Sequence, residues 1–110
     1  MITEIKTKQE LAALEAAVNE AARVALKYKD ADDGGACNFD TPLLAVKIPK
    51  RLRDATALHL ARCWGRYSKC YIIEDIPLYG QGDRRSEMAE AACESLRTSG
   101  YAATMYYQMD

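Results

Sequence analysis

Apolar residues recur at helical spacing through the first third of the chain. They form an apolar seam of Leu11, Leu14, Val18, Ala21, Ala25 and Tyr28. Steps of three and four residues place such positions on one face of a helix. Thr7 and Glu10 have the capping-box pattern, in which each side chain accepts a bond from the other residue's backbone N–H. The pattern predicts a long N-terminal helix over residues 7–29. We expect its seam to pack on the protein's own sheet and to be partly used by a second copy.

Helical and strand patterns alternate along the rest of the chain. We expect, in order, a loop over 30–40, a strand over 41–49, a helix over 51–63, a strand over 69–76, a Gly-rich loop over 77–83, a helix over 84–98 that stops at Gly100, and a strand over 101–109. This alternation predicts an α+β or small α/β fold, with helices packed on a sheet of three or more strands. At 110 residues, the chain 1–110 is expected to form a single domain.

Composition narrows the classes of partner. A formal net charge of -1 gives no overall attraction to a nucleic acid polymer or to anionic lipid, so an anion site must be local. The start is charged from its fourth residue, and no apolar run reaches membrane-spanning length. The four cysteines, Cys37, Cys63, Cys70 and Cys93, form no C-x-x-C pair. We therefore expect a cytoplasmic protein with reduced thiols, no membrane partner and no nucleic acid polymer partner.

The stretch GQGDRRS places two arginines where a helix is expected to begin. Its candidate site residues are Gly80, Gln81, Gly82, Arg84 and Arg85. With Asp83 as the N-cap, both arginines fall in the first turn, where the helix dipole opposes a positive charge. The two glycines let the backbone turn sharply and present N–H groups. Amides, a helix N-terminus and two guanidinium groups together favour an anion-binding loop. The alternative is a surface turn with two solvated arginines.

The polar stretch GGACNFD holds a second candidate site. Phe39 is the only Phe of the chain and lies between Asn38 and Asp40. An aromatic ring can stack on a base, and an Asn amide can pair with a purine edge. A carboxylate can accept both hydroxyls of a ribose. In the alternative interpretation, Asn38 and Asp40 only cap a turn that Phe39 anchors. The residues alone leave both interpretations open.

The remaining chemistry-bearing residues favour binding over catalysis. His59, the single His, and Cys63 lie four apart on the predicted second helix, but a closed zinc site needs about four ligands, so no metal is expected. The chain contains no G-x-S-x-G, H-E-x-x-H or P-loop pattern and no recognisable acid pair. We expect no catalytic residue, no enzyme activity and no cofactor. Trp64, Tyr101, Tyr106 and Tyr107 are expected in the core or an interface, where one or two could line a nucleotide pocket.

Three segments carry a resemblance to a known family. GGACNFDTP, GQGDRRSEMAEA and the terminal GYAATMYYQMD together resemble the Thoeris anti-defence sponges of phages. Members of that family bind cyclic ADP-ribose isomers made by bacterial TIR-domain enzymes and hold them without degrading them. The resemblance covers residues 33–110, which would form a candidate nucleotide-binding α/β core behind the long first helix.

The resemblance implies a role for each candidate loop. Arg84 and Arg85 would clamp a pyrophosphate, Phe39 would stack on the base, and Asp40 would accept the ribose. It also implies a homo-oligomer, a dimer or larger, and a viral or prophage counter-defence function in the cytosol of the infected bacterial host. A non-catalytic interaction or inhibitor protein that acts through its N-terminal helix or its acidic loop is the alternative. An enzyme acting on nucleotides would need a general base beside the arginines, and the sequence provides none there.

Overall fold

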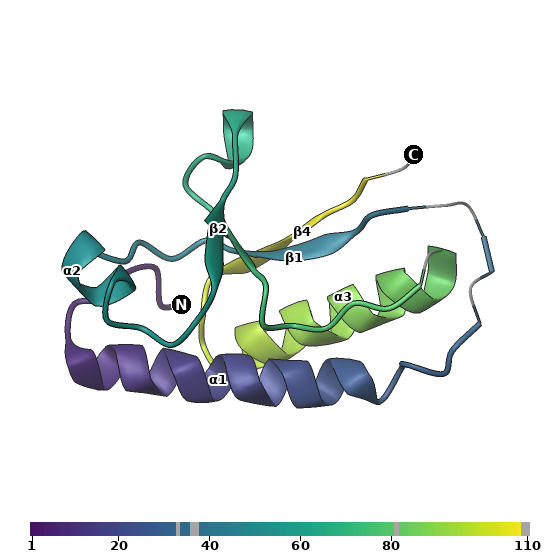
Figure 1. Cartoon of the computed structure of the whole chain (residues 1–110), viewed down its shortest axis with the longest axis horizontal. Coiled ribbons are helices and arrows are strands. Elements are labelled where there is room, and N and C mark those ends of the chain that lie inside the picture. The colour runs from purple at the N-terminus through teal and green to yellow at the C-terminus, as the bar shows by residue number, and fades with distance from the viewer. Residues whose placement is uncertain (33, 36–37, 81, 109–110) are drawn as a thin grey trace.

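The computed structural model describes residues 1–32, 34–35, 38–80 and 82–108, and its long helices lie together on one side of a sheet (Figure 1). In these residues the elements are α1 (Lys8–Leu26), β1 (Thr41–Leu44), α2 (Lys50–Arg53), β2 (Leu60–Arg62), the 3₁₀ turn η1 (Gly65–Tyr67), β3 (Tyr71–Ile73), α3 (Gly82–Thr98) and β4 (Ala103–Tyr106). The predicted α+β class is therefore confirmed, as is the long N-terminal helix.

Local sequence signals set the beginning of α1. The Thr7 hydroxyl accepts from the Glu10 N–H at 3.1 Å, and the Glu10 carboxylate accepts from the Thr7 N–H at 3.0 Å, so the capping box is formed. The helix ends at Leu26, before the end of the predicted range 7–29. Tyr28 lies beyond it and is exposed.

The apolar seam of α1 belongs to the core of its own chain. Leu14, Val18 and Ala21 are completely buried, and Leu11 is nearly so. The facing helix α3 buries its own apolar stripe, which consists of Met88, Ala89, Ala92, Cys93 and Leu96. Small residues on both helices permit this close approach. Of the seam, only Tyr28 beyond the helix stays exposed, and its use by a second copy stays a prediction.

In the described part of the chain, α1 and α3 lie on one face of the sheet and neither covers the other face (Figure 1). The strand order of the sheet is β2-β3-β1-β4, with antiparallel neighbours throughout. The connections from β1 to β2 and from β3 to β4 each pass over one strand, as in a split β-α-β arrangement. Leu44 lies in the core with the helices, so Leu43, its neighbour in the strand, faces the opposite side. Leu43 is paired with Ile72 on β3 and Thr104 on β4 across that side.

The predicted second helix over 51–63 is wrong. Only the single turn α2 is helical, and residues 60–62 form β2, which pairs with β3. The apolar spacing in this segment fits a helix, but pairing with a distant strand satisfies its backbone groups. The predicted strand over 41–49 is also shorter. After Leu44 the chain pairs with the N-terminal segment, where the Lys47 N–H donates to Thr3 at 2.8 Å.

Candidate functional site

The two candidate loops lie against each other in the folded chain. The Asn38 amide donates to the Gly82 carbonyl at 3.0 Å. In the same region the Asp83 N–H donates to the Gly34 carbonyl at 2.7 Å. Segments 44 or more residues apart in the sequence are thereby joined at the beginning of α3.

Asp40 is a buried tether rather than an open acceptor. Its side chain is nearly inaccessible, with a relative exposure of 5%. One carboxylate oxygen accepts from the Ser86 hydroxyl at 3.0 Å and the other from the Gln108 N–H at 3.0 Å. Asn38 also bonds within the turn, accepting from the Asp40 N–H at 3.4 Å. This geometry favours the turn-capping interpretation for both residues, because a ribose would have to displace internal hydrogen bonds.

The glycines of the arginine loop have the backbone freedom that the sequence indicates. Gly80 and Gly82 have φ angles of 74° and 60°, in the left-handed region that other residues avoid. One detail of the prediction is wrong: α3 begins at Gly82, so Asp83 lies in the first turn and is not the N-cap. Gln81 and Cys37 lie outside the described residues.

Arg84 and Arg85 occupy the first turn of α3 as predicted, but they bond to different segments. The Arg84 guanidinium donates to the Lys29 carbonyl, just after α1, at 3.1 Å. The Arg85 Nε–H donates to the Asp40 carbonyl at 2.9 Å. Each arginine therefore ties α3 to a preceding loop, and the alternative of two merely solvated side chains is wrong.

Phe39 and Arg85 form the part of the site that an incoming ligand can reach. The Phe39 ring remains 40% exposed, while its backbone N–H is held by Gln108 at 2.7 Å. The Arg85 guanidinium carbon lies 6.0 Å from the ring centroid, at the limit of a cation–π contact. Burial lowers the pKa of Arg85, and the nearby Asp40 charge opposes this shift. A partly desolvated cation of this kind is stabilised further by an added negative charge.

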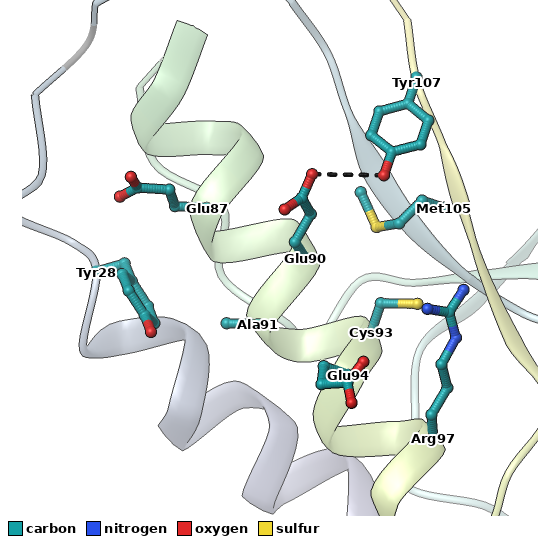
Figure 2. Close-up of a pocket in the computed structure, with 9 residues that line it drawn as sticks. All are labelled: Tyr28, Glu87, Glu90, Ala91, Cys93, Glu94, Arg97, Met105 and Tyr107. Atoms are coloured by element: carbon teal, nitrogen blue, oxygen red, sulfur yellow. Dashed lines mark hydrogen bonds between the residues drawn. The ribbon is translucent and has the colours of Figure 1, made fainter.

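A separate hollow of about 470 Å³ lies beside α3 and is acidic (Figure 2). It is lined by Tyr28, Glu87, Glu90, Ala91, Cys93, Glu94, Arg97, Met105 and Tyr107. The Tyr107 hydroxyl contacts Glu90 at 3.4 Å, and the Arg97 Nε–H donates to the Ala103 carbonyl. Three carboxylates in one hollow repel a pyrophosphate, so this hollow does not suit an anionic ligand.

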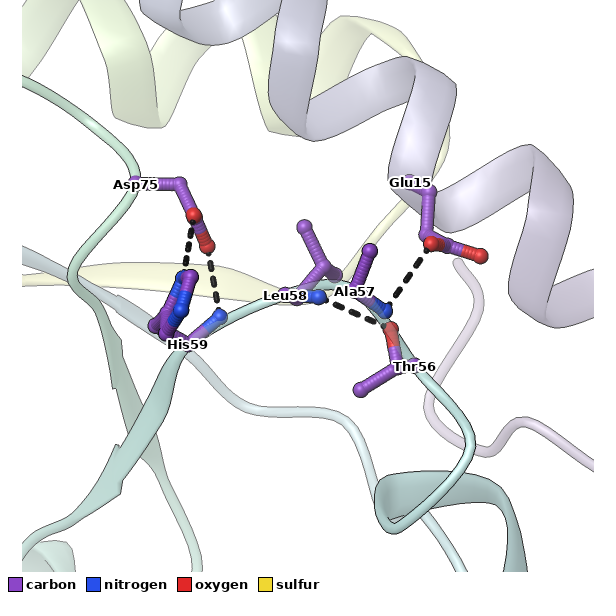
Figure 3. Close-up of polar contacts among 6 residues, drawn as sticks. All are labelled: Glu15, Thr56, Ala57, Leu58, His59 and Asp75. Carbon is purple, nitrogen blue, oxygen red and sulfur yellow. Dashed lines mark hydrogen bonds and ion pairs between the residues drawn. The ribbon is translucent and has the colours of Figure 1, made fainter.

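His59 and Cys63 do not share a helix face. His59 precedes β2 and Cys63 follows it. The His59 ring and backbone N–H both contact the Asp75 carboxylate, at 2.8 and 2.7 Å (Figure 3). In the part of the chain that the structure describes, no three His, Cys, Asp or Glu side chains are grouped as metal ligands.

This contact predicts a pH dependence at His59. The hydrogen bond to Asp75, followed by the charge of that carboxylate, raises the pKa of His59 above its ordinary value. Because the folded-state pKa is the higher one, the contact stabilises the fold below the unfolded-state pKa, and this contribution is lost as the pH rises through the folded-state pKa. In an NMR titration, the ring protons of this single His should give a midpoint above about 6.5. Asp75→Asn should bring the midpoint down, and an unchanged midpoint would contradict the pairing.

Two residues of the site were missed by sequence reasoning. Ser86 and Gln108 hold the Asp40 carboxylate, yet neither stands out in the sequence. Ser86 follows the two arginines directly, and Gln108 lies in the segment expected to be a plain strand. The three acidic residues that line the hollow beside α3 could have been recognised in the sequence, because Glu87, Glu90 and Glu94 recur at helical spacing.

Comparison with protein-family models, curated proteins and solved structures finds no match to this chain. In the residues that the structure describes, no helix combines the length and the apolar content needed to span a bilayer.

Proposed function

We propose that the protein binds a cyclic ADP-ribose-type nucleotide signal at the Phe39 and Arg85 loops and sequesters it without degrading it. One observation supports this most directly. An exposed aromatic ring and a partly buried guanidinium lie beside each other at the start of a helix. A ring that stacks on a base and a cation that holds a phosphate are the two contacts that a nucleotide needs most.

Phe39 and Arg85 keep the roles expected from the sequence, whereas those of Arg84 and Asp40 change. Phe39 provides the stacking surface and Arg85 the phosphate contact, assisted by the N-terminal end of α3. Arg84 also carries charge in this first turn, although it is tied to Lys29. Asp40 acts through the turn that presents Phe39, because its carboxylate is already bonded to Ser86 and Gln108.

Storage of the signal, rather than its conversion, fits the chemistry of these loops. Asp40 is the acid nearest to Arg85 in the contacts described, and its buried carboxylate is not available as a general base. The resemblance to the Thoeris anti-defence sponges supplies the biological setting, a phage or prophage protein that acts against a host signalling system. A homo-oligomer remains part of the proposal, with a contact surface other than the buried residues of the apolar seam.

Phe39→Ala is the sharpest test of the site. It should weaken binding of cyclic ADP-ribose in calorimetry by about 1–3 kcal/mol, the usual contribution of one stacked base. The melting temperature should fall only slightly, since Phe39 is 40% exposed. Trp64→Ala removes a more exposed aromatic ring from another part of the chain and should leave this affinity unchanged. Equal affinity of the Phe39→Ala and native proteins for every cyclic ADP-ribose isomer tested would refute the site.

A second experiment separates sequestration from catalysis. The protein is incubated with the cyclic nucleotide, freed of unbound ligand and denatured by heat. Mass spectrometry of the released molecules should recover the intact nucleotide. Recovery of a linear or cleaved product would instead identify an enzyme.

A further inference from the structure

The β2–β3 hairpin exposes an aromatic tip. Trp64 is 90% exposed, more than any other large hydrophobic side chain that the structure describes. Next to it, Tyr67 packs edge-on against Tyr106 of β4, with ring centroids 4.9 Å apart. The tip is thus held against the sheet while its indole ring stays in water. An exposed indole beside fixed aromatic rings is typical of a contact surface.

A small hollow lies beside this tip on the helix-free face of the sheet. Its volume is about 260 Å³, and it is lined by Leu43, Arg62, Cys63, Trp64, Tyr67, Ile72 and Tyr106. Leu43 and Ile72 are direct partners in the β1–β3 register, and the half-buried Ile72 forms the accessible part of an apolar floor, since Leu43 is only 1% exposed. Whole-ligand pockets usually measure roughly 300–1,000 Å³, so this hollow suits a single flat ring better than a complete nucleotide signal.

The hairpin itself carries positive charge. Residues 60–73 contain three cations, Arg62, Arg66 and Lys69, and no Asp or Glu, although Glu74 and Asp75 follow directly. Arg62 lines the aromatic hollow and also a neighbouring one with Lys47 and Lys69. The Arg66 guanidinium lies 5.0 Å from the centroid of the Tyr67 ring. The overall net charge of -1 conceals this local excess of cations.

We propose that this surface, the hairpin face, binds single-stranded nucleic acid. One base would stack on Trp64 over the apolar floor, and the adjoining phosphates would contact Arg62 and Arg66. An antiparallel sheet face that carries aromatic side chains and no helix is an established platform for unpaired bases. Cations that follow the backbone beside such rings complete this mode of binding. An acidic protein partner would neutralise the positive side chains, but it would leave the flat hollow without a function. A duplex keeps its bases paired and stacked inside the helix, so it cannot place an unpaired base against Trp64.

The only Trp of the chain reports on this contact directly. An oligothymidylate of about 12 residues, within the site sizes known for single strands, should quench Trp64 emission in the native protein. The affinity should fall as salt rises, with a log–log slope of about -0.7 for each phosphate contacted. Absence of quenching at low salt would overturn the proposal.

Substitutions separate stacking from simple charge attraction. In an anisotropy assay with the labelled oligonucleotide, Trp64→Ala should weaken binding roughly 5- to 150-fold. Arg66→Ala should make the salt slope shallower by about 0.7. Tyr107→Ala, which removes another exposed aromatic ring, should change neither quantity. Circular dichroism melts should match the native protein for all three, because each side chain is exposed.

Competing occupants give distinct results in the same assays. Equal affinity for a duplex of the same length would reduce the contact to charge alone and overturn the stacking proposal. Stronger quenching by anionic vesicles, or by polyglutamate as a substitute for an acidic protein, would assign the hairpin face to a membrane or to a protein partner. Phe39→Ala should leave oligonucleotide binding intact, so this proposal and the proposed nucleotide site fail independently.

Discussion

Asp40→Ala should lower the free energy of unfolding by about 3–6 kcal/mol, because two hydrogen bonds to a charged group contribute roughly 1.5–3 kcal/mol each. The buried carboxylate bonds Ser86 of α3 and Gln108 after β4, and so joins the beginning of one element to the end of another. Its removal leaves the half-buried Ser86 hydroxyl and the Gln108 backbone N–H without their partner. Urea unfolding followed by circular dichroism measures the loss.

Two further variants distinguish a tether from a ligand contact. Asp40→Asn keeps the shape and can still accept from Gln108, so its loss should be smaller. Asp32→Ala removes an exposed acid from the same acidic loop and should change stability by less than about 0.5 kcal/mol. A stable Asp40→Ala protein that no longer binds the nucleotide would restore the ribose-acceptor role expected from the sequence.

Leu14→Ala should lower the free energy of unfolding by about 2–5 kcal/mol, the usual effect of a cavity in a packed core. Leu14 is fully buried where α1 meets the sheet and α3, so surrounding side chains cannot close the gap without losing their own contacts. Urea unfolding should show a lower midpoint with an unchanged slope, since the surface exposed on unfolding stays nearly the same.

Leu26→Ala is the matched control for Leu14→Ala. Leu26 is the last residue of the same helix and is 38% exposed, so its truncation should cost less than about 1 kcal/mol. Light scattering adds an independent measurement. If Leu14→Ala disrupts an oligomer while the subunit stays equally stable, the seam is an interface and the packing described above is wrong.

Some elements of the fold could be predicted because their signals are local. The capping box of Thr7 and Glu10 and the three- and four-residue apolar steps specify α1 within one stretch of chain. Gly100 marks the end of α3, where the Tyr101 N–H donates back to the Leu96 carbonyl at 3.1 Å. Such contacts span only a few residues, so their residue types and spacing are sufficient to indicate them.

The segment over 51–63 shows where local signals fail. Its apolar spacing satisfies a helical pattern, yet Leu60 pairs with Ile73 and the chain becomes a strand. Strand pairing is a non-local choice, and propensity within a short segment does not determine it. The same limit applies to charge. Arg62 is a plain surface cation in the sequence, and only strand pairing and packing bring it beside Leu43 and Tyr106 of distant strands.

The sequence by itself determined the class of fold, its long first helix and the two loops that hold the candidate residues. Helix caps, glycines and apolar periodicity act between neighbours in the chain, and they can be read there. Only the tertiary structure decided what those residues do. It buries the Asp40 carboxylate, places Phe39 beside Arg85, and buries the apolar seam from Leu11 to Ala25 in the core. Burial and hydrogen-bond partners depend on segments some 40 to 70 residues apart, so no local pattern could specify them.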